Sequence, residues 1–207
     1  LITTTSGDGT VLGYDIRTEG DKIRSRIGYM PEYDALDPDL SAIDQVRYAG
    51  ELLGMNPAHA TRRAHEVLEY VGLKDQRYRK IETYSTGMKQ AAKLACALVH
   101  DPDVLICDEP TNGLDQRARE FMLQTLRRTV SEGNRSVLMS SHVMDDVQEV
   151  CDRIVMIHNG KIVVQRRIED LARQIEREIE ISVWGGASRM QQELESRGFA
   201  VRRLGRV

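Results

Sequence analysis

Apolar residues recur with the period of a helix along the first half of the chain. The segment Ser-Ala-Ile-Asp at 41–44 has the pattern of a capping box, whose side chains bond the free N–H groups at a helix start. It predicts a helix whose apolar face is formed by Val46, Ala49 and Leu53. Another helix is predicted from Pro57 to a stop at Gly72. Its apolar stripe consists of Ala64, Val67, Leu68 and Val71.

Short apolar runs alternate with helical patterns in the second half of the chain. The run at 104–107 is continuous, which is typical of a strand buried on both faces. A helix is predicted over 116–132, with an apolar face formed by Ala118, Met122, Leu126 and Val130. Further strands are predicted at 26–30, 136–140 and 153–157. Strands that alternate with crossover helices indicate an α/β fold with a mostly parallel sheet.

The two ends of the chain carry shorter elements. Residues 10–14 form a predicted extended run, and a turn at 158–161 predicts a β-hairpin. Beyond this turn, the pattern predicts a charged helix over 168–177, a strand at 179–183, a helix at 188–197 and an extended run at 199–204. We therefore predict an α/β domain over residues 1–165, with a helical subdomain at about 41–95, and a small β-α-β accessory region over residues 166–207.

The composition is that of an ordinary globular protein, with 41% hydrophobic and 29% charged residues among 207. A net charge of −3 argues against nucleic acid as the main partner, because duplex binding normally uses a strong basic patch. The sequence has no apolar run of the 18 or more residues that span a bilayer. The cysteines at 96, 107 and 151 lie far apart, and we expect them to be small buried residues rather than metal ligands.

Two adjacent carboxylates, Asp108 and Glu109, follow the apolar run at 104–107. This position is the carboxyl edge of a parallel sheet, where ligands bind in open α/β folds. An Asp there can hold Mg²⁺ directly or through water, because Mg²⁺ prefers oxygen ligands. The next carboxylate can orient or deprotonate a water that attacks a phosphate. Taken without their context, the two residues fit equally well an ordinary acidic pair that caps a helix.

The segment Ser85-Thr86-Gly87 stands at a predicted helix start. Backbone N–H groups at such a start, together with a hydroxyl, bind anions. Gly87 lets a phosphate approach the backbone closely. Taken alone, the segment fits better a serine that only caps the helix, so its meaning depends on the motifs that follow.

In their order, these segments resemble the motifs of ABC-type ATPases. Residues 84–90, Tyr-Ser-Thr-Gly-Met-Lys-Gln, are similar to the signature motif of that family, although Tyr84 and Thr86 depart from the usual Leu and Gly. Residues 104–109 resemble the Walker B strand, 113–115 the D-loop and 141–142 the H-loop. The resemblance covers residues 1 to about 165.

The resemblance implies a role for each matching residue. Asp108 would bind Mg²⁺, Glu109 would act as the catalytic base, and His142 would contact the γ-phosphate of ATP. Glu32 stands where the family usually carries Gln; it can accept a hydrogen bond from water or bind Mg²⁺, but it cannot donate when ionised. The residues that the resemblance places on ATP held by a second subunit are Ser85, Thr86, Gly87, Gln90 and Asp115.

The phosphate loop of the family, Gly-x-x-x-x-Gly-Lys-Ser/Thr, does not occur in these 207 residues. The stretch 5–15 resembles the segment that follows the first helix after that loop. The implied fold is therefore a P-loop NTPase-like ABC ATPase core without its first strands. Either the sequence belongs to a longer protein or the protein has lost the loop, and the intact catalytic residues favour the former.

The implied function is that of an ATP-binding and ATP-hydrolysing subunit of an ABC transporter, peripheral to the cytoplasmic face of the membrane. It would use ATP and Mg²⁺ and pair with a second ABC ATPase subunit, identical or different. It would power export through a transmembrane permease on a separate chain, and the Pro31-Glu32 pair resembles the drug and antibiotic exporter branch. Two alternatives stay open: a non-transport ABC ATPase acting on DNA or ribosomes, and a catalytically inactive regulatory subunit.

Overall fold

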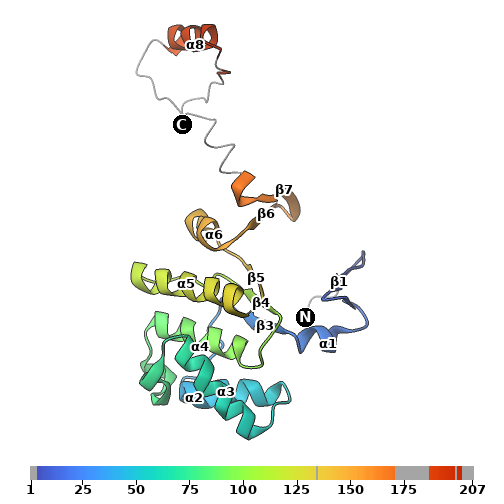
Figure 1. Cartoon of the computed structure of the whole chain (residues 1–207), viewed down its shortest axis with the longest axis vertical. Helices are drawn as coiled ribbons and strands as arrows, with labels where there is room; N and C mark the ends of the chain where they lie inside the picture. Colours follow the sequence, from blue (N-terminus) through green and yellow to red (C-terminus); the bar gives the residue numbers. More distant parts are fainter. Residues whose placement is uncertain (1–3, 134, 171–186, 199, 202–207) are drawn as a thin grey trace. The chain divides into compact units, whose positions relative to one another are not determined.

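The structure is a computed structural model that describes residues 4–133, 135–170, 187–198 and 200–201 (Figure 1). The chain forms two compact units, residues 1–151 and residues 152–207, and each is described by itself. The boundary that the sequence predicts near residue 165, between the α/β domain and the accessory region, stays a prediction.

A parallel three-stranded sheet forms the centre of the first unit. In spatial order its strands are β3 (Ile27–Met30), β4 (Val104–Cys107) and β5 (Ser136–Met139). The register places Tyr29 opposite Ile106 and Ile106 opposite Leu138. The parallel pairing confirms the α/β sheet that the alternation of strands and helices predicts.

Strand β4 is buried on one face only, so the prediction of burial on both faces is wrong. Leu105 and Cys107 are buried in the main core, whereas Ile106 is partly exposed. On the same face as Ile106, Tyr29 is 50% exposed and Leu138 is 61% exposed. The run is apolar enough for two covered faces, but the described residues cover only one of them.

A helical layer packs against the core side of this sheet (Figure 1). It comprises the helices α2 (Ala42–Leu52), α3 (Pro57–Tyr70) and α4 (Thr86–Leu98), with the short 3-10 turns η1 (Lys74–Tyr78) and η2 (Ile81–Thr83) before α4. Ser41, Asn56 and Ser85 cap the three helices, because each side chain accepts a backbone N–H from three residues further on. The predicted helix starts at Ser41, Pro57 and Ser85 are thereby confirmed.

The predicted apolar faces are confirmed for α3 and only partly for α2. Ala64, Val67, Leu68 and Val71 are all buried. In α2, Val46 is buried, but Leu53 is 45% exposed because the helix ends one residue before it. Gly50 is buried in its place, close to Ala60 and Val99.

Helix α5 (Gln116–Gly133) connects β4 to β5, and α6 (Met144–Val150) follows β5. Met122 and Leu126 of α5 are buried as predicted, but Val130 is exposed and Thr129 is buried instead. The Thr129 hydroxyl donates to the Thr125 carbonyl at 2.9 Å, so burial leaves its polar group satisfied.

The first residues of the chain form a hairpin of β1 (Thr10–Val11) and β2 (Tyr14–Asp15), followed by the short helix α1 (Gly20–Arg24). The predicted extended run at 10–14 is therefore wrong. The chain reverses at Leu12 and Gly13, whose φ angles of 54° and 82° suit a two-residue hairpin turn.

The second unit contains the antiparallel hairpin of β6 (Arg153–His158) and β7 (Lys161–Arg167), which confirms the predicted turn at 158–161. Residues 168–170 are helical, and α8 (Ala187–Ser196) matches the predicted helix at 188–197. The rest of the predicted charged helix, the strand at 179–183 and most of the run at 199–204 lie outside the described residues.

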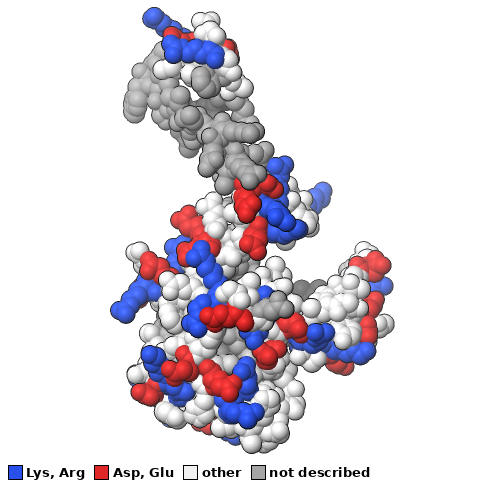
Figure 2. Space-filling view, viewed as in Figure 1, with Lys and Arg blue, Asp and Glu red and all other residues white. Residues whose placement is uncertain are grey.

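Positive and negative side chains lie intermingled on the face that Figure 2 shows. Within the described part of the chain, no helix has both the length and the apolar character needed to cross a membrane. Burial raises the pKa of the Cys96 and Cys107 thiols to about 12, so both thiols stay protonated and unreactive at neutral pH.

Candidate functional site

The carboxylate of Asp108 lies at the carboxyl end of β4 and is held there by the neighbouring strand. Its backbone N–H donates to the Met30 carbonyl of β3 at 2.8 Å. Its side chain accepts from the Ser140 hydroxyl, just after β5, at 2.7 Å. The same hydroxyl accepts the Glu109 N–H at 2.9 Å, so one serine fixes both acidic residues at the sheet edge.

Glu109 and His142 form a direct pair across this edge. The Nδ1 atom of His142 lies 3.0 Å from Oε2 of Glu109. The Glu109 side chain is 19% exposed and the His142 ring 72% exposed, so the imidazole extends from a sheltered carboxylate into solvent. Glu109 has a φ of 46°, a left-handed conformation that is uncommon for a residue with a side chain of this size.

Glu32 follows β3 at the same edge of the sheet. Its Oε1 accepts from the Asn112 side-chain amide at 3.2 Å, which connects it to the loop after Glu109. The negative charge of Asp108 also acts on Tyr29, whose pKa is raised first by desolvation and then by this carboxylate. The carboxyl ends of three adjacent strands thus bring together Glu32, Asp108, Glu109 and His142.

The residues of the signature-like segment lie at the start of α4. Ser85 caps this helix by accepting the Met88 N–H at 3.3 Å. A Cβ added to Gly87 would lie 3.2 Å from the Cβ of Ala118, so the glycine allows α4 and α5 to approach each other. The methyl carbon of Thr86 faces Gly113 of the loop before α5.

Asp115 and Gln90 take part in contacts within the subunit. The Asp115 carboxylate accepts the Ala118 N–H at 2.8 Å and so caps the first turn of α5. Gln90 is buried, and its amide donates to the Asn112 carbonyl at 3.3 Å. Contact of either side chain with a nucleotide on a second subunit stays a prediction.

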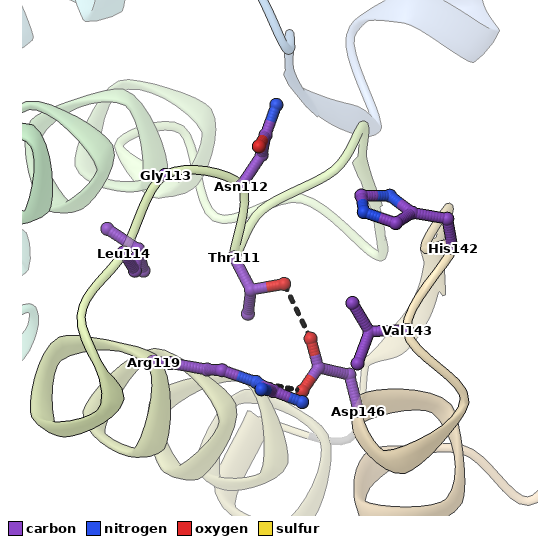
Figure 3. A pocket seen from close by; sticks show the side chains of 8 residues that line it. All are labelled: Thr111, Asn112, Gly113, Leu114, Arg119, His142, Val143 and Asp146. Carbon is purple, nitrogen blue, oxygen red and sulfur yellow. Dashed lines mark hydrogen bonds and ion pairs between the residues drawn. The ribbon is translucent and has the colours of Figure 1, made fainter.

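A small polar pocket of about 180 Å³ lies between the loop after β4 and the start of α6 (Figure 3). Asp146, which is fully buried, accepts from the Thr111 hydroxyl and from Arg119 Nε, both at 2.6 Å. The pocket is lined by Thr111, Asn112, Gly113, Leu114, Arg119, His142, Val143 and Asp146.

Sequence reasoning missed the supporting residues Ser140, Asn112 and Asp146. Ser140 could have been noticed, because it ends a predicted strand beside the acidic pair. Asp146 carried no such signal, since its neighbour Asp145 is equally acidic and lies on the same short helix.

The chemistry of this edge suits Mg²⁺ bound largely through water and phosphate. Among the described residues, no group of three or more His, Cys, Asp or Glu side chains could hold a metal ion by themselves. Mg²⁺ commonly takes only one or two carboxylates and keeps several waters. Asp108, held in place by Ser140, fits the part of such a carboxylate.

The chain was compared with known proteins. A family model described as ABC transporter matches residues 1–112. The linearmycin resistance ATP-binding protein LnrL of Bacillus subtilis is 39% identical over 175 residues, which cover 84% of this chain and 56% of that protein. The daunorubicin/doxorubicin resistance ATP-binding protein DrrA of Streptomyces peucetius is 34% identical over 80% of this chain and 50% of its own length.

The chain spans about half the length of most of the curated relatives it matches, with 50% to 57% coverage. An exception is the ABC transporter ATP-binding protein NatA of Bacillus subtilis, 33% identical and covered to 70%. A solved ATP-binding subunit of an ABC transporter matches 90% of the chain and is itself covered to 75%, with a TM-score of 0.68 and 26% identity. A dimeric ATP-binding cassette bound to ADP and Pi matches 79% and is covered to 74%, with a TM-score of 0.70 and 22% identity, which is a likeness of fold.

Proposed function

Because the chain belongs to the ABC transporter family of ATP-binding proteins, we propose that it powers export by hydrolysing ATP for a separate membrane-spanning subunit. In this proposal it lies on the cytoplasmic face of the membrane and pairs with a second ATP-binding subunit. The resistance proteins among its relatives support the direction of transport and the drug or antibiotic class of substrate.

The observation that carries the proposal is the 3.0 Å contact between Glu109 and His142 at the carboxyl edge of the sheet. A general base must reach the proton it removes, and a histidine bonded to it can hold it in one orientation. Glu109 is the proposed base toward the attacking water, and His142 orients it and reaches the γ-phosphate. The exposed ring of His142 is placed to meet a ligand from solvent.

The other residues have supporting roles in this proposal. Asp108 would hold Mg²⁺, which neutralises charge on the phosphates, and Glu32 would bind the metal or the attacking water from the next strand. The helix start at Ser85, with Thr86, Gly87 and Gln90, and the D-loop Asp115 would act on nucleotide held by the second subunit. Ser85 and Gly87 suit such a contact because helix N-termini bind anions.

The decisive experiment is the substitution Glu109→Gln in the natural protein. The amide keeps the size of the side chain but cannot take a proton from water, so phosphate release should fall by roughly 100-fold or more. Mg·ATP binding, measured by titration calorimetry, should stay within about threefold of the unchanged protein, because the base contributes little to ground-state binding.

Glu120→Gln on the exposed surface of α5 is the matched control and should leave turnover unchanged. His142→Ala should lower turnover strongly, because it removes the partner of Glu109. Near-normal phosphate release by the Glu109 variant would remove this residue from the role of base.

A further inference from the structure

Lys93 is a buried lysine in the middle of α4, only 5% exposed. Its ammonium donates to three successive backbone carbonyls of the loop after β3. The distances are 2.8 Å to Pro31, 2.9 Å to Glu32 and 3.3 Å to Tyr33. This loop carries Glu32, so the Lys93 side chain connects α4 to the sheet edge.

The number of partners fits the chemistry of the group. A lysine ammonium has three N–H donors and no acceptor, and here three carbonyl oxygens accept from it. Burying an ammonium is costly unless its donors are satisfied. Burial lowers the pKa of Lys93, while the nearby charges of Asp34 and Glu32 oppose that shift. The site therefore suits a flexible cation. An apolar side chain at position 93 would leave the three carbonyls without the ammonium donor.

Two further contacts join the same segments. Lys89, one turn before Lys93 on α4, pairs with Asp34 at 2.8 Å, and this hydrogen bond is the main cause of the lowered pKa of Asp34. Gln90 of α4 donates to the carbonyl of Asn112, whose own amide donates to the Glu32 carboxylate. Glu32 is therefore held through its backbone by Lys93 and through its side chain by Asn112, and both supports lead back to α4.

We propose that Lys93 is a positioning residue that fixes the loop of residues 31–33 to α4 and so holds Glu32 in place at the sheet edge. The role of Glu32 in this inference rests on the proposed function, whereas the attachment of the loop by Lys93 does not.

The attachment can be tested without any ATPase measurement, because Glu32 is the only glutamate in the loop 31–40. We expect a glutamate-specific protease to cut after Glu32 faster when the loop detaches from α4, because Lys93 then no longer holds the carbonyl of the bond to be cut. In the variant Lys93→Met, which keeps the length of the side chain but removes its donors, cleavage after Glu32 should be about tenfold faster. Cleavage after Glu66, within α3, reports general unfolding and should be unchanged.

The matched control is Lys89→Met, which removes an exposed pair between side chains and should speed cleavage by no more than about twofold. Lys93→Gln retains two donors and should give an intermediate rate; it also serves if the Met variant does not fold. Equal cleavage after Glu32 in the unchanged protein, Lys93→Gln and Lys93→Met would overturn the attachment, as would equal acceleration at Glu66.

The action through Glu32 is tested by a double-mutant cycle in the protein made from its natural coding sequence. Lys93→Met alone should lower kcat about tenfold, with KM for Mg·ATP changed less than threefold. In a Glu32→Ala background the same substitution should lower kcat less than twofold, because the residue to be positioned is already lost. Independent, multiplicative losses would mean that Lys93 only supports the fold.

The protease experiment and the double-mutant cycle together distinguish failure of the inference from failure of the proposed function. If Glu32→Ala leaves turnover unchanged, the proposed role of Glu32 is wrong, and so is the inference that Lys93 positions it for catalysis. The protease rates still decide whether Lys93 attaches the loop to α4.

Discussion

At the scale of single residues, buried polar groups show where the fold depends on protonation. The Nε2 atom of His100 lies 3.1 Å from the Ile27 carbonyl, and its Nδ1 atom is buried without a partner among the described residues. A neutral ring satisfies this arrangement by donating from Nε2. Protonation would add a second N–H with no acceptor. Burial also disfavours the charged ring and so lowers the pKa of His100.

This arrangement predicts acid sensitivity. The folded chain binds a proton at His100 less readily than the unfolded chain, whose histidines have a pKa of about 6.5. The stabilisation is complete above that pH and is lost as the pH falls through the lower pKa of the folded state. The thermal midpoint should therefore fall between pH 7.5 and pH 5, and it should fall less in His100→Gln. Equal slopes in both proteins would show that His100 is not a source of the acid sensitivity.

Several residues of the site and of the core could be identified from the sequence, whereas others needed the fold. Asp108 and Glu109 stand out because an apolar strand ends on them, and the structure places both at the sheet edge. Lys93 could not be identified from the sequence, because lysine is almost never buried unless its charge is satisfied. Its partners lie about 60 residues earlier in the chain, so no local pattern could reveal them.

At the scale of elements, the fold depends on how closely β3 and α4 pack. Gly28 lies in the middle of β3, and a Cβ built there would stand 2.1 Å from the Ala97 carbonyl oxygen of α4. That oxygen belongs to the backbone and cannot rotate away. The absence of a side chain at Gly28 thus sets the distance between the sheet and the helix that carries Ser85 and Lys93.

Gly28→Ala should lower the free energy of unfolding by about 3 kcal/mol or prevent folding, because α4 would have to move away from the sheet. Gly20→Ala is the control: its nearest neighbours are the guanidinium atoms of Arg24, which can swing aside. It should change the free energy of unfolding by less than about 1 kcal/mol. Urea denaturation measures both, and similar values for the two variants would contradict the close-packing argument.

The elements themselves were largely predictable, and the errors have local causes. Helix α3 was predictable from its apolar stripe, because four buried positions recur at helical spacing. The assignment of Val130 to the core failed because threonine hydroxyls bond within the helix. Thr125 and Thr129 bury their polar groups in this way and face the Tyr70 hydroxyl. A sequence pattern scores such threonines as polar and therefore predicts the buried face of the helix at the wrong positions.

At the scale of the whole chain, the uncovered sheet face has consequences for association. Tyr29, Ile106 and Leu138 form one row across the three strands, and β3 and β5 are the outer strands of the described sheet. Exposed apolar edge strands favour pairing between molecules. The 207-residue chain made alone is therefore expected to self-associate.

Leu138→Lys tests this expectation, because a charged side chain on an edge strand opposes pairing. Light scattering at a fixed protein concentration should fall clearly relative to the unchanged chain. Leu52→Lys, on helix α2 and also exposed, should have a much smaller effect. A monomeric and sharply melting unchanged chain would contradict the prediction.

The left-handed backbone of Glu109 has a consequence for the evolution of this chain. Glycine or asparagine adopts a φ of 46° at little cost, so selection for stability alone would replace the glutamate. A glutamate at this strained position indicates a residue retained for function rather than for stability. If Glu109 has the catalytic role proposed above, position 109 should drift toward glycine early in descendants that have lost that role, while Gly28 should persist because the fold itself requires it.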